Sequence, residues 1–357
     1  MLDTYGWSET LQRQFTDHAA RGFAPGRVIV QQRGLYRLAT PQGEVSAEPS
    51  GKFLHEALSG DHPVAGDWVA CAVREQEGAA TIHHLLPRSS VFIRRASGTG
   101  GGSQVVAANV DLVLLVASLN ADLSLRRLER YLATAWESGA QPVIVLTKAD
   151  ACEDAQALIA QVESIAFGVP VHAVSAVTGQ GVAQVSNLLA PGKTAVLLGS
   201  SGVGKSTLVN ALAGVELMAT GGVREDDAKG RHTTTHRELV VLPTGALVLD
   251  TPGMRELGLW DADEGVAAAF GDIEALAAAC RFRDCGHQAE PGCAVRAALD
   301  RGELDAGRWR SYGKLQRELA HLDRRDDPQA QVENRKLWIQ RHKASRQRLK
   351  HRDREAY

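Results

Sequence analysis

A glycine-rich segment that ends in lysine and serine has the most specific chemical potential in this sequence. Residues 199–207 read Gly-Ser-Ser-Gly-Val-Gly-Lys-Ser-Thr and lie between an apolar run and a helical pattern. Glycines at this spacing let backbone N–H groups surround a phosphate chain, and the start of the helix adds the positive end of its dipole. Lys205 would reach the β- and γ-phosphates, and Ser206 would bind Mg²⁺. The expected phosphate-binding residues are Gly199, Ser200, Ser201, Gly202, Val203, Gly204, Lys205, Ser206 and Thr207.

A second polar segment, Thr-Lys-Ala-Asp, follows the apolar run at residues 143–146. Guanine presents two adjacent donors, N1–H and the N2 amine, which one carboxylate can accept together, whereas adenine presents neither. Asp150 is therefore expected to read guanine, while the stem of Lys148 covers the face of the base. A Ser-Ala pair after the next apolar run would bring a backbone N–H to guanine O6. The expected base-binding residues are Thr147, Lys148, Ala149, Asp150, Ser175 and Ala176.

Two further segments are expected to sense the third phosphate. An Asp-Thr-Pro-Gly segment ends an apolar run, so that Asp250 can hold Mg²⁺ through water and the Gly253 N–H can meet the γ-phosphate. A His-Thr-Thr-Thr segment precedes it, and either Thr234 or Thr235 is expected to bind Mg²⁺ and the γ-phosphate. Together with the base-binding residues, these segments favour GTP over ATP.

The residue after the Asp-Thr-Pro-Gly segment is Met254, at the position where Ras-type GTPases carry a glutamine that orients the attacking water. A thioether cannot donate a hydrogen bond to that water. Intrinsic hydrolysis is therefore expected to be slow, and a partner is expected to complete the site. His232 is the nearest substitute and is the candidate catalytic residue.

The order of these segments is unusual, because the base-binding segments at 147–150 and 175–176 precede the phosphate-binding loop at 199–207. GTPases normally have the loop first. A sheet can be cut and rejoined in this way because strands that are neighbours in space need not be neighbours in sequence. Both phosphate-sensing segments then lie at the C-terminal end of the nucleotide domain, directly before the part of the chain that follows residue 260.

Three cysteines and a histidine cluster at residues 280–293 with the spacing Cys-x4-Cys-x-His-x5-Cys. Four ligands of this type are what a closed structural Zn²⁺ site needs. The alternative is a group of buried free thiols, which the clustering disfavours, since the rest of the chain holds only Cys71 and Cys152. These two are interpreted as inert thiols. The expected zinc ligands are Cys280, Cys285, His287 and Cys293.

Composition places the chain among ordinary globular proteins, with 357 residues, 44% hydrophobic and 23% charged residues. The sequence contains neither a long apolar run nor a secretory leader pattern at its start, which favours a cytoplasmic protein without membrane contact. The net charge of −2 hides an asymmetry, because residues 335–357 carry nine Lys or Arg against two acidic residues. A basic tail on an acidic body indicates either a polyanionic partner or a solvated charged helix.

The elements that must position these residues follow from hydrophobic periodicity. Short β-rich runs at 27–31, 35–40, 51–58, 67–73 and 80–86 predict a five-stranded barrel, either OB-like or SH3-like. Later, apolar runs alternate with helical patterns, which predicts a parallel sheet with helices on both faces. We therefore expect a multidomain α/β protein with the following parts. They are residues 1–93, an N-terminal helix and OB-like barrel; 94–104, a flexible linker; 105–261, a circularly permuted P-loop GTPase domain; 262–327, a helical zinc-binding domain; and 328–357, a basic tail.

Taken together, the segment from Gln104 to Asp111, the TKAD, GSSGVGKST, HTTT and DTPG motifs and the Cys-Cys-His-Cys cluster resemble the RsgA (YjeQ) family of small-subunit biogenesis GTPases. The resemblance covers nearly the whole chain. It implies hydrolysis of GTP to GDP and phosphate, stimulated by the 30S ribosomal subunit late in its maturation. It also implies that the barrel and zinc domain contact 16S rRNA, that one structural Zn²⁺ and Mg²⁺ with GTP are bound, and that the protein is a monomer. Thr147 stands where the family commonly has asparagine, so the asparagine side-chain amide is absent.

Other functions remain open at this point. The glycine-rich segment could be a turn without a ligand, which the flanking strand and helix patterns disfavour. The chain could be a non-enzymatic rRNA-binding protein with a vestigial nucleotide pocket, although Lys205, Ser206, Asp250 and Asp150 are all intact. It could also be a permuted GTPase that acts on the large subunit.

Overall fold

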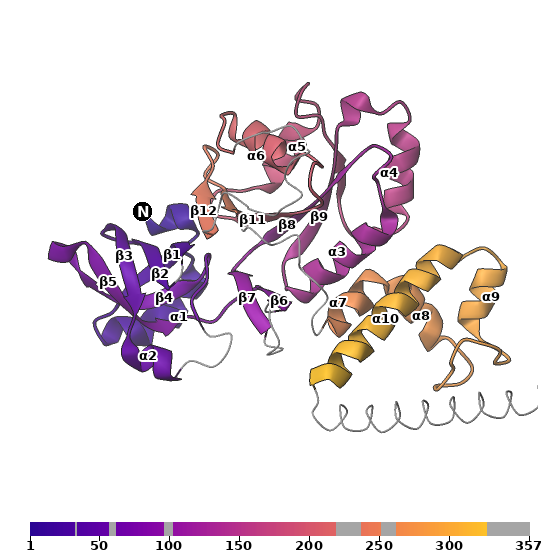
Figure 1. The fold of residues 1–357 in the computed structure, drawn as a ribbon, viewed down its shortest axis with the longest axis horizontal. Coiled ribbons are helices and arrows are strands. Elements are labelled where there is room, and N and C mark those ends of the chain that lie inside the picture. The colour runs from indigo at the N-terminus through magenta and orange to yellow at the C-terminus, as the bar shows by residue number, and fades with distance from the viewer. Residues whose placement is uncertain (33, 57–61, 96–102, 219–236, 251–261, 327–357) are drawn as a thin grey trace, which may run out of the picture.

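The computed structural model describes residues 1–32, 34–56, 62–95, 103–218, 237–250 and 262–326, with the side chains of 95, 103, 250 and 323–326 left out. A barrel, an α/β domain and a helical C-terminal module follow one another along the chain (Figure 1). Within the described residues, the structure contains no helix that is long and apolar enough to cross a membrane.

A short N-terminal segment lies against the barrel. It consists of η1 (Leu2–Tyr5) and α1 (Glu9–Ala20). The helix begins after Ser8, whose hydroxyl accepts the N–H of Leu11 and so caps the first turn. Phe15 of α1 is buried, and the rings of Trp7 and Trp68 meet edge to face with centroids 5.0 Å apart. These aromatic contacts fix the segment on the barrel.

The barrel is closed, because its first strand pairs with both the second and the fourth. Its strands are β1 (Ala24–Gln32), β2 (Leu35–Thr40), β3 (Gly43–Pro49), β4 (Trp68–Arg74) and β5 (Ala79–Leu85). Around the barrel the order is β1-β2-β3-β5-β4, with β3 and β5 parallel and the other pairs antiparallel. This arrangement confirms the predicted OB-like barrel.

One predicted strand of the barrel is wrong. Residues 51–58 contain the helix α2 (Gly51–Glu56) and not a strand. The hydroxyl of Ser50 accepts the N–H of Phe53 at 3.1 Å and stabilises the first turn of this helix. The third strand is instead β3, in which Val45 and Ala47 face the interior and Ser46 faces solvent.

The segment predicted as a flexible linker at 94–104 is in part ordered. β6 (Val91–Arg95) and β7 (Ser103–Ala108) pair antiparallel, and Arg94 lies opposite Gln104. The side chains of this pair are hydrogen-bonded, since the Arg94 Nε donates to Gln104 Oε1 at 3.1 Å. The two described ends of the connection between the barrel and the α/β domain therefore pair with each other as antiparallel strands.

The α/β domain has its phosphate-loop strand in the middle of the sheet. The strands are β8 (Leu112–Ser118), β9 (Gln141–Thr147), β10 (Val171–Ala173), β11 (Thr194–Leu198), β12 (Arg237–Val241) and β13 (Leu247–Asp250). Their spatial order is β10-β9-β8-β11-β13-β12, and all neighbours are parallel except β12 and β13. Parallel strands end at one edge, so the loops after β8, β9 and β11 meet there.

Helices cover both faces of this sheet, as alternation along β8 requires. They are α3 (Leu125–Glu137), α4 (Ala155–Glu163), α5 (Val182–Leu188) and α6 (Lys205–Ala213), with η3 (Ala149–Ala151) after β9. Val113 and Leu115 pack in one core with Leu128 of α3. Leu114 packs in the opposite core with Leu208 of α6.

The barrel and the α/β domain share one continuous sheet. β1 pairs antiparallel with β12, with Val30 opposite Glu238 and Gln31 opposite Arg237. Side chains reinforce this pairing, because Arg237 donates to Gln31 Oε1 at 2.9 Å. β1, which closes the barrel by pairing with β4, is thus also paired with β12 of the α/β domain.

The C-terminal module packs on α3 (Figure 1). Its helices are α7 (Asp263–Ala269), α8 (Gly271–Ala278), α9 (Ala294–Asp300) and α10 (Ala306–Asp326). A Cβ on Gly265 would come within 2.1 Å of the Ala133 carbonyl oxygen, so α7 and α3 touch backbone to backbone. Arg308 is buried between Glu129 of α3 and Asp272 of α8. Close packing and paired charges together join the module to the α/β domain.

Candidate nucleotide and metal sites

The phosphate-binding loop, residues 199–207, connects β11 to α6 in the conformation that its glycines permit. Gly202 and Gly204 have φ values of 77° and 92°, a left-handed region that favours glycine. At Gly199, a Cβ would come within 2.3 Å of the Val116 carbonyl oxygen. Each of these positions therefore excludes a side chain for a steric reason, and the loop is held close to the end of β8.

Lys205 is the first residue of α6, and Ser206 and Thr207 follow in its first turn. The Lys205 ammonium donates to the carbonyl oxygens of Gly199 at 2.7 Å and Ser200 at 2.6 Å, which keeps it over the loop. A cation beside a helix N-terminus is suited to bind an anionic phosphate chain.

The base-binding segment, residues 147–150, lies directly against this loop. Thr147 is buried, and its hydroxyl contacts the Val203 carbonyl oxygen at 2.5 Å and the Ala117 carbonyl oxygen at 3.2 Å. The Lys148 ammonium donates to the Gly202 carbonyl oxygen at 3.0 Å, from a residue with φ 60°. The hydroxyl of Thr147 thus connects the two segments.

The Ser-Ala pair follows β10 and borders the base-binding segment. The N–H of Ala149 donates to the Val174 carbonyl oxygen at 3.1 Å, so the two loops are in contact. Ser175 is fully buried, and its hydroxyl accepts the N–H of Thr178 at 3.1 Å. Ala176 comes next in this turn, and Asp150 is exposed in the middle of η3.

The phosphate-sensing residues are described only in part. The backbone of Asp250 ends β13, whereas its side chain and the residues His232, Thr234, Thr235 and Gly253 lie outside the described residues. The strands that flank the two segments are neighbours, because Glu238 near the start of β12 lies opposite Asp250 at the end of β13. The described residues next to both segments, Arg237 and Asp250, therefore lie close together in the sheet.

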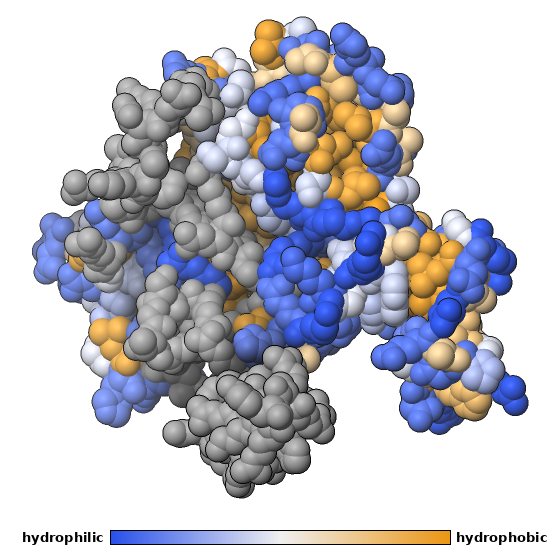
Figure 2. Space-filling view, turned by 45° about the vertical axis from the view of Figure 1, so that its right-hand side comes forward, coloured by the Kyte–Doolittle hydropathy of each residue, from blue (hydrophilic) through white to orange (hydrophobic). Residues whose placement is uncertain are grey.

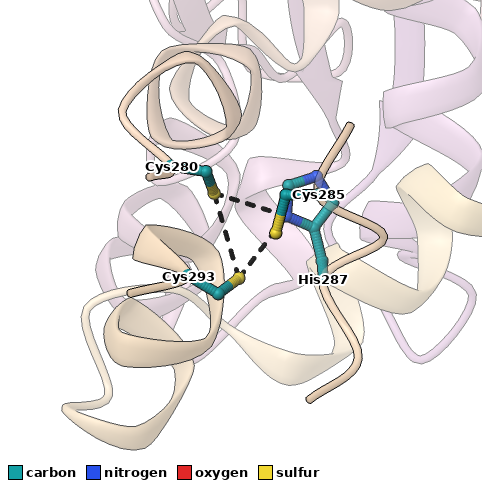
Figure 3. Close-up of side chains that lie close together, drawn as sticks. All are labelled: Cys280, Cys285, His287 and Cys293. Atoms are coloured by element: carbon teal, nitrogen blue, oxygen red, sulfur yellow. Dashed lines mark hydrogen bonds between the residues drawn. The ribbon is translucent and has the colours of Figure 1, made fainter. Parts of the chain in front are cut away.

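The four predicted metal ligands meet at one point in the C-terminal module (Figure 3). All their ligand atoms lie within 4.8 Å of one another. The Sγ atoms of Cys280 and Cys293 each lie 3.5 Å from Nδ1 of His287 and 3.9 Å from each other. A tetrahedral zinc ion needs about 3.8 Å between sulfurs and about 3.5 Å between sulfur and nitrogen, given its usual bond lengths. The cluster can therefore hold a tetrahedral metal ion.

Local hydrogen bonds hold the ligands in this arrangement. Cys293 is the N-cap of α9, and its sulfur accepts the N–H of Arg296 at 3.4 Å. Desolvation raises the pKa of Cys280, but hydrogen bonds from the backbone of Val295 and Ala294 and from the other two cysteines outweigh it, and the net pKa is lowered. A lowered pKa favours the thiolate, the form that binds metal, at Cys280, whereas desolvation raises the pKa of Cys285 to about 11.

Glu290 organises the loop that carries His287. Its carboxylate accepts the N–H groups of Gly286 and Gln288 at 2.8 Å and of Ala289 at 2.9 Å. His287 lies between these donors with φ 56°, a conformation that is rare outside glycine. Backbone N–H groups, its own included, lower the pKa of Glu290 to about 2. Sequence reasoning missed this residue, because an acid near a cluster of soft ligands has no distinctive spacing.

Comparisons with known proteins agree with this architecture. A barrel, a permuted phosphate-loop domain and a Cys-Cys-His-Cys cluster together define a circularly permuted P-loop protein. The family model described as "RsgA GTPase" matches residues 85–260. A protein from Opitutus terrae named small ribosomal subunit biogenesis GTPase RsgA is 48% identical over 97% of both chains. A protein from Oceanobacillus iheyensis with the name RsgA 1 is 46% identical over 87% of this chain and 90% of its own.

Solved structures give the same result. The crystal structure of YjeQ from Thermotoga maritima matches with a TM-score of 0.64 and 28% identity, over 84% of this chain and 99% of that one. The structure of YloQ, described as a circularly permuted GTPase, matches with a TM-score of 0.61 and 25% identity, over 84% and 96%. The chain belongs to the RsgA GTPase family.

Proposed function

We propose that this protein hydrolyses GTP to GDP and phosphate and acts late in maturation of the small ribosomal subunit. The observation that carries the proposal is the direct contact between the phosphate-binding loop and the base-binding segment through Thr147 and Lys148. That contact supports a phosphate site and a guanine reader in adjacent loops of one nucleotide site. The names of the relatives from Opitutus terrae and Oceanobacillus iheyensis support the biological role.

Each predicted residue has a role in this proposal. Lys205 contacts the β- and γ-phosphates, and Ser206 binds Mg²⁺ together with water held by Asp250. Asp150 accepts both guanine donors, with Lys148 over the base and the Ala176 region near O6. Thr234 or Thr235 and the N–H of Gly253 report the γ-phosphate. His232 orients the attacking water, since Met254 cannot.

The metal cluster is proposed to bind one structural Zn²⁺. Three thiolates and an imidazole are soft or borderline ligands, which zinc prefers over magnesium or calcium. Four protein ligands complete a tetrahedral shell and leave no open position for a substrate. The ion would stabilise the C-terminal module and leave the hydrolysis of GTP to the α/β domain.

The proposed partner is the 30S subunit, bound through 16S rRNA by the barrel and the C-terminal module. We further propose a cytoplasmic monomer. The described surface in Figure 2 mixes hydrophilic and apolar residues, with broader apolar areas at the upper right and at the right of the view. Large exposed apolar side chains such as Leu54, Phe167 and Phe282 come from different parts of the fold. Scattered apolar residues of this kind do not require a protein partner.

GTP turnover with and without purified 30S subunits tests the proposal. Slow release of phosphate by the free protein, and a large increase with 30S but not 50S subunits, is the expected result. Absence of turnover with intact binding to 16S rRNA would support the non-enzymatic alternative. Stimulation by 50S subunits alone would assign the protein to the large subunit.

A further inference from the structure

The phosphate-binding loop has a second contact, with the start of α3. Arg127, in the first turn of α3, donates through Nη1 to the hydroxyl of Ser200 at 2.8 Å. The same nitrogen lies 3.2 Å from the Asp122 carboxylate. Arg127 and Ser200 line a crevice of about 10 Å³, which holds one water molecule at most. The start of α3 and the loop are therefore in close contact.

Ser200 connects this contact to the lysine of the loop. Its hydroxyl accepts from Arg127, and its carbonyl oxygen accepts from the Lys205 ammonium at 2.6 Å. A shift of Ser200 would therefore move a carbonyl group that accepts from Lys205. A guanidinium that donates to a hydroxyl and is paired with a carboxylate has a defined orientation.

The rest of α3 is attached to the C-terminal module. Arg126 pairs with Asp305 at 2.5 Å, and Arg130 donates through Nη1 to Glu318 at 2.9 Å. Glu129 is fully buried and pairs with Arg308 of α10. Consecutive turns of one short helix thus bind the module on one side and the phosphate-binding loop at the N-terminal end.

We propose that Arg127 is a positioning residue for the nucleotide: it fixes Ser200, and through Ser200 the Lys205 ammonium, relative to α3 and the C-terminal module. Arg127 contacts neither phosphate nor base in this role. The inference rests on the proposed nucleotide site and adds the route by which the module influences it. A rigid helix with paired charges along one side transmits a displacement of the module to the loop.

The test is a double-mutant cycle on the full-length protein, read out by equilibrium titration of GDP. Arg127→Ala is expected to weaken GDP binding about fivefold to tenfold. This loss is smaller than the loss expected on removing a fully buried charge-assisted hydrogen bond, because the Arg127 side chain is 40% exposed. In the Ser200→Ala background the same substitution should change the affinity less than about twofold. Arg127→Lys should retain part of the affinity, since lysine can reach one acceptor but lacks the fork.

A second cycle tests the link to the module. Glu318→Ala removes the partner of Arg130 and is expected to weaken GDP binding about twofold to threefold. Its effect should vanish in the Arg127→Ala background. Arg317→Ala is the matched control. Arg317 is an exposed residue of α10, and its described hydrogen bond is to the Gly313 carbonyl oxygen of the same helix. Thermal unfolding midpoints of all variants should agree within about 3 °C.

Outcomes separate this inference from the proposed function. GDP binding reports on the loop whether or not GTP is hydrolysed. If wild type binds GDP and Arg127→Ala binds it equally well, Arg127 does not position the loop. Equal losses in the wild-type and Ser200→Ala backgrounds would overturn the route through Ser200, and equal effects of Glu318→Ala in both Arg127 backgrounds would overturn the link to the module. If wild type binds no GDP, both the nucleotide site and this inference fail.

Discussion

At the scale of single residues, the Thr147 hydroxyl joins the base-binding segment to the phosphate-binding loop. The Thr147 hydroxyl contacts the Val203 carbonyl oxygen of the phosphate-binding loop, and both residues are buried. Thr147→Val keeps the shape but removes the donor, which leaves the Val203 carbonyl oxygen unsatisfied. We expect GDP affinity to fall about tenfold, measured by titration, whereas Thr147→Ser should remain within about twofold of wild type. Equal affinities for Val and Ser would show that the hydroxyl is dispensable.

Glu290 gives a second prediction at this scale. Both carboxylate oxygens of Glu290 accept loop N–H groups. Glu290→Gln keeps one oxygen as an acceptor and replaces the other with an amino group, which cannot accept. The loop around His287 should loosen, and zinc should be released to a chromogenic chelator several times faster than from wild type. Glu303→Gln is the control, since Glu303 pairs with Arg301 at the surface of the same module. Release at the wild-type rate would mean that Glu290 does not hold the ligand loop.

A third prediction concerns the proposed catalytic residue. His232→Ala should keep its affinity for GTP and lose roughly 10²-fold or more of the turnover measured with 30S subunits, as other positioned catalytic groups do. The variant should also remain bound to the subunit with GTP, which sedimentation would detect. Full stimulated turnover would assign the attacking water to another group, including one from rRNA.

At the scale of elements, β1 belongs both to the barrel and to the sheet of the α/β domain. Its first half pairs with β4 to close the barrel, and its second half pairs with β12. Arg27 is the last residue of the first half, opposite Trp68, and donates to the carbonyl groups of Tyr5 and Asn109 and to the Thr194 hydroxyl. Burial lowers its pKa to about 10, so the guanidinium still carries its charge at neutral pH.

Because of these contacts, Arg27→Ala should destabilise the junction strongly. It leaves buried acceptors without a donor and opens a cavity beside Trp68, which together cost about 2–4 kcal/mol. Arg37→Ala is the matched control, because its pairs with Glu44 and Glu238 are exposed and contribute less than about 1 kcal/mol. Urea unfolding followed by tryptophan fluorescence measures both, and the reverse ranking would contradict the role of Arg27.

At the scale of the whole molecule, the cysteines divide into two groups. Cys71 is fully buried in the barrel core, and burial raises its pKa to about 12, so the thiol stays protonated and unreactive at pH 8. The metal cluster holds three thiols that zinc would shield. With zinc bound, iodoacetamide should therefore modify Cys152 at most, and chelation should expose three more thiols. Mass spectrometry that finds Cys280 modified before chelation would argue against a bound metal.

Metal removal should also act locally. The buried residues Ile273, Val295 and Leu315 of the module share one core with α3, while α6, which follows the phosphate-binding loop, packs in a separate core around Leu208. Chelation is therefore expected to unfold the region around residues 280–293 and to leave most of the GDP affinity.

The sequence by itself determined the chemistry and most of the elements. Glycine spacing, the Thr-Lys-Ala-Asp segment and the cysteine spacing are local patterns, and local patterns can be read without a fold. Alternation of apolar runs likewise predicted β8, β9 and β11 and the helices between them. The prediction failed at residues 51–58, where a serine cap gives α2 in a region of β-like composition.

Only the tertiary structure decided how these pieces meet. Thr147 and Val203 are 56 positions apart, Arg127 and Ser200 are 73 apart, and β1 meets β12 across most of the chain. Such contacts leave no periodic trace, because each depends on which strands become neighbours and on the exact side of a helix that faces a loop. The sequence predicted the residues of the nucleotide and metal sites. The fold brought Thr147 and Arg127 to the phosphate-binding loop and Glu290 to the loop that carries His287.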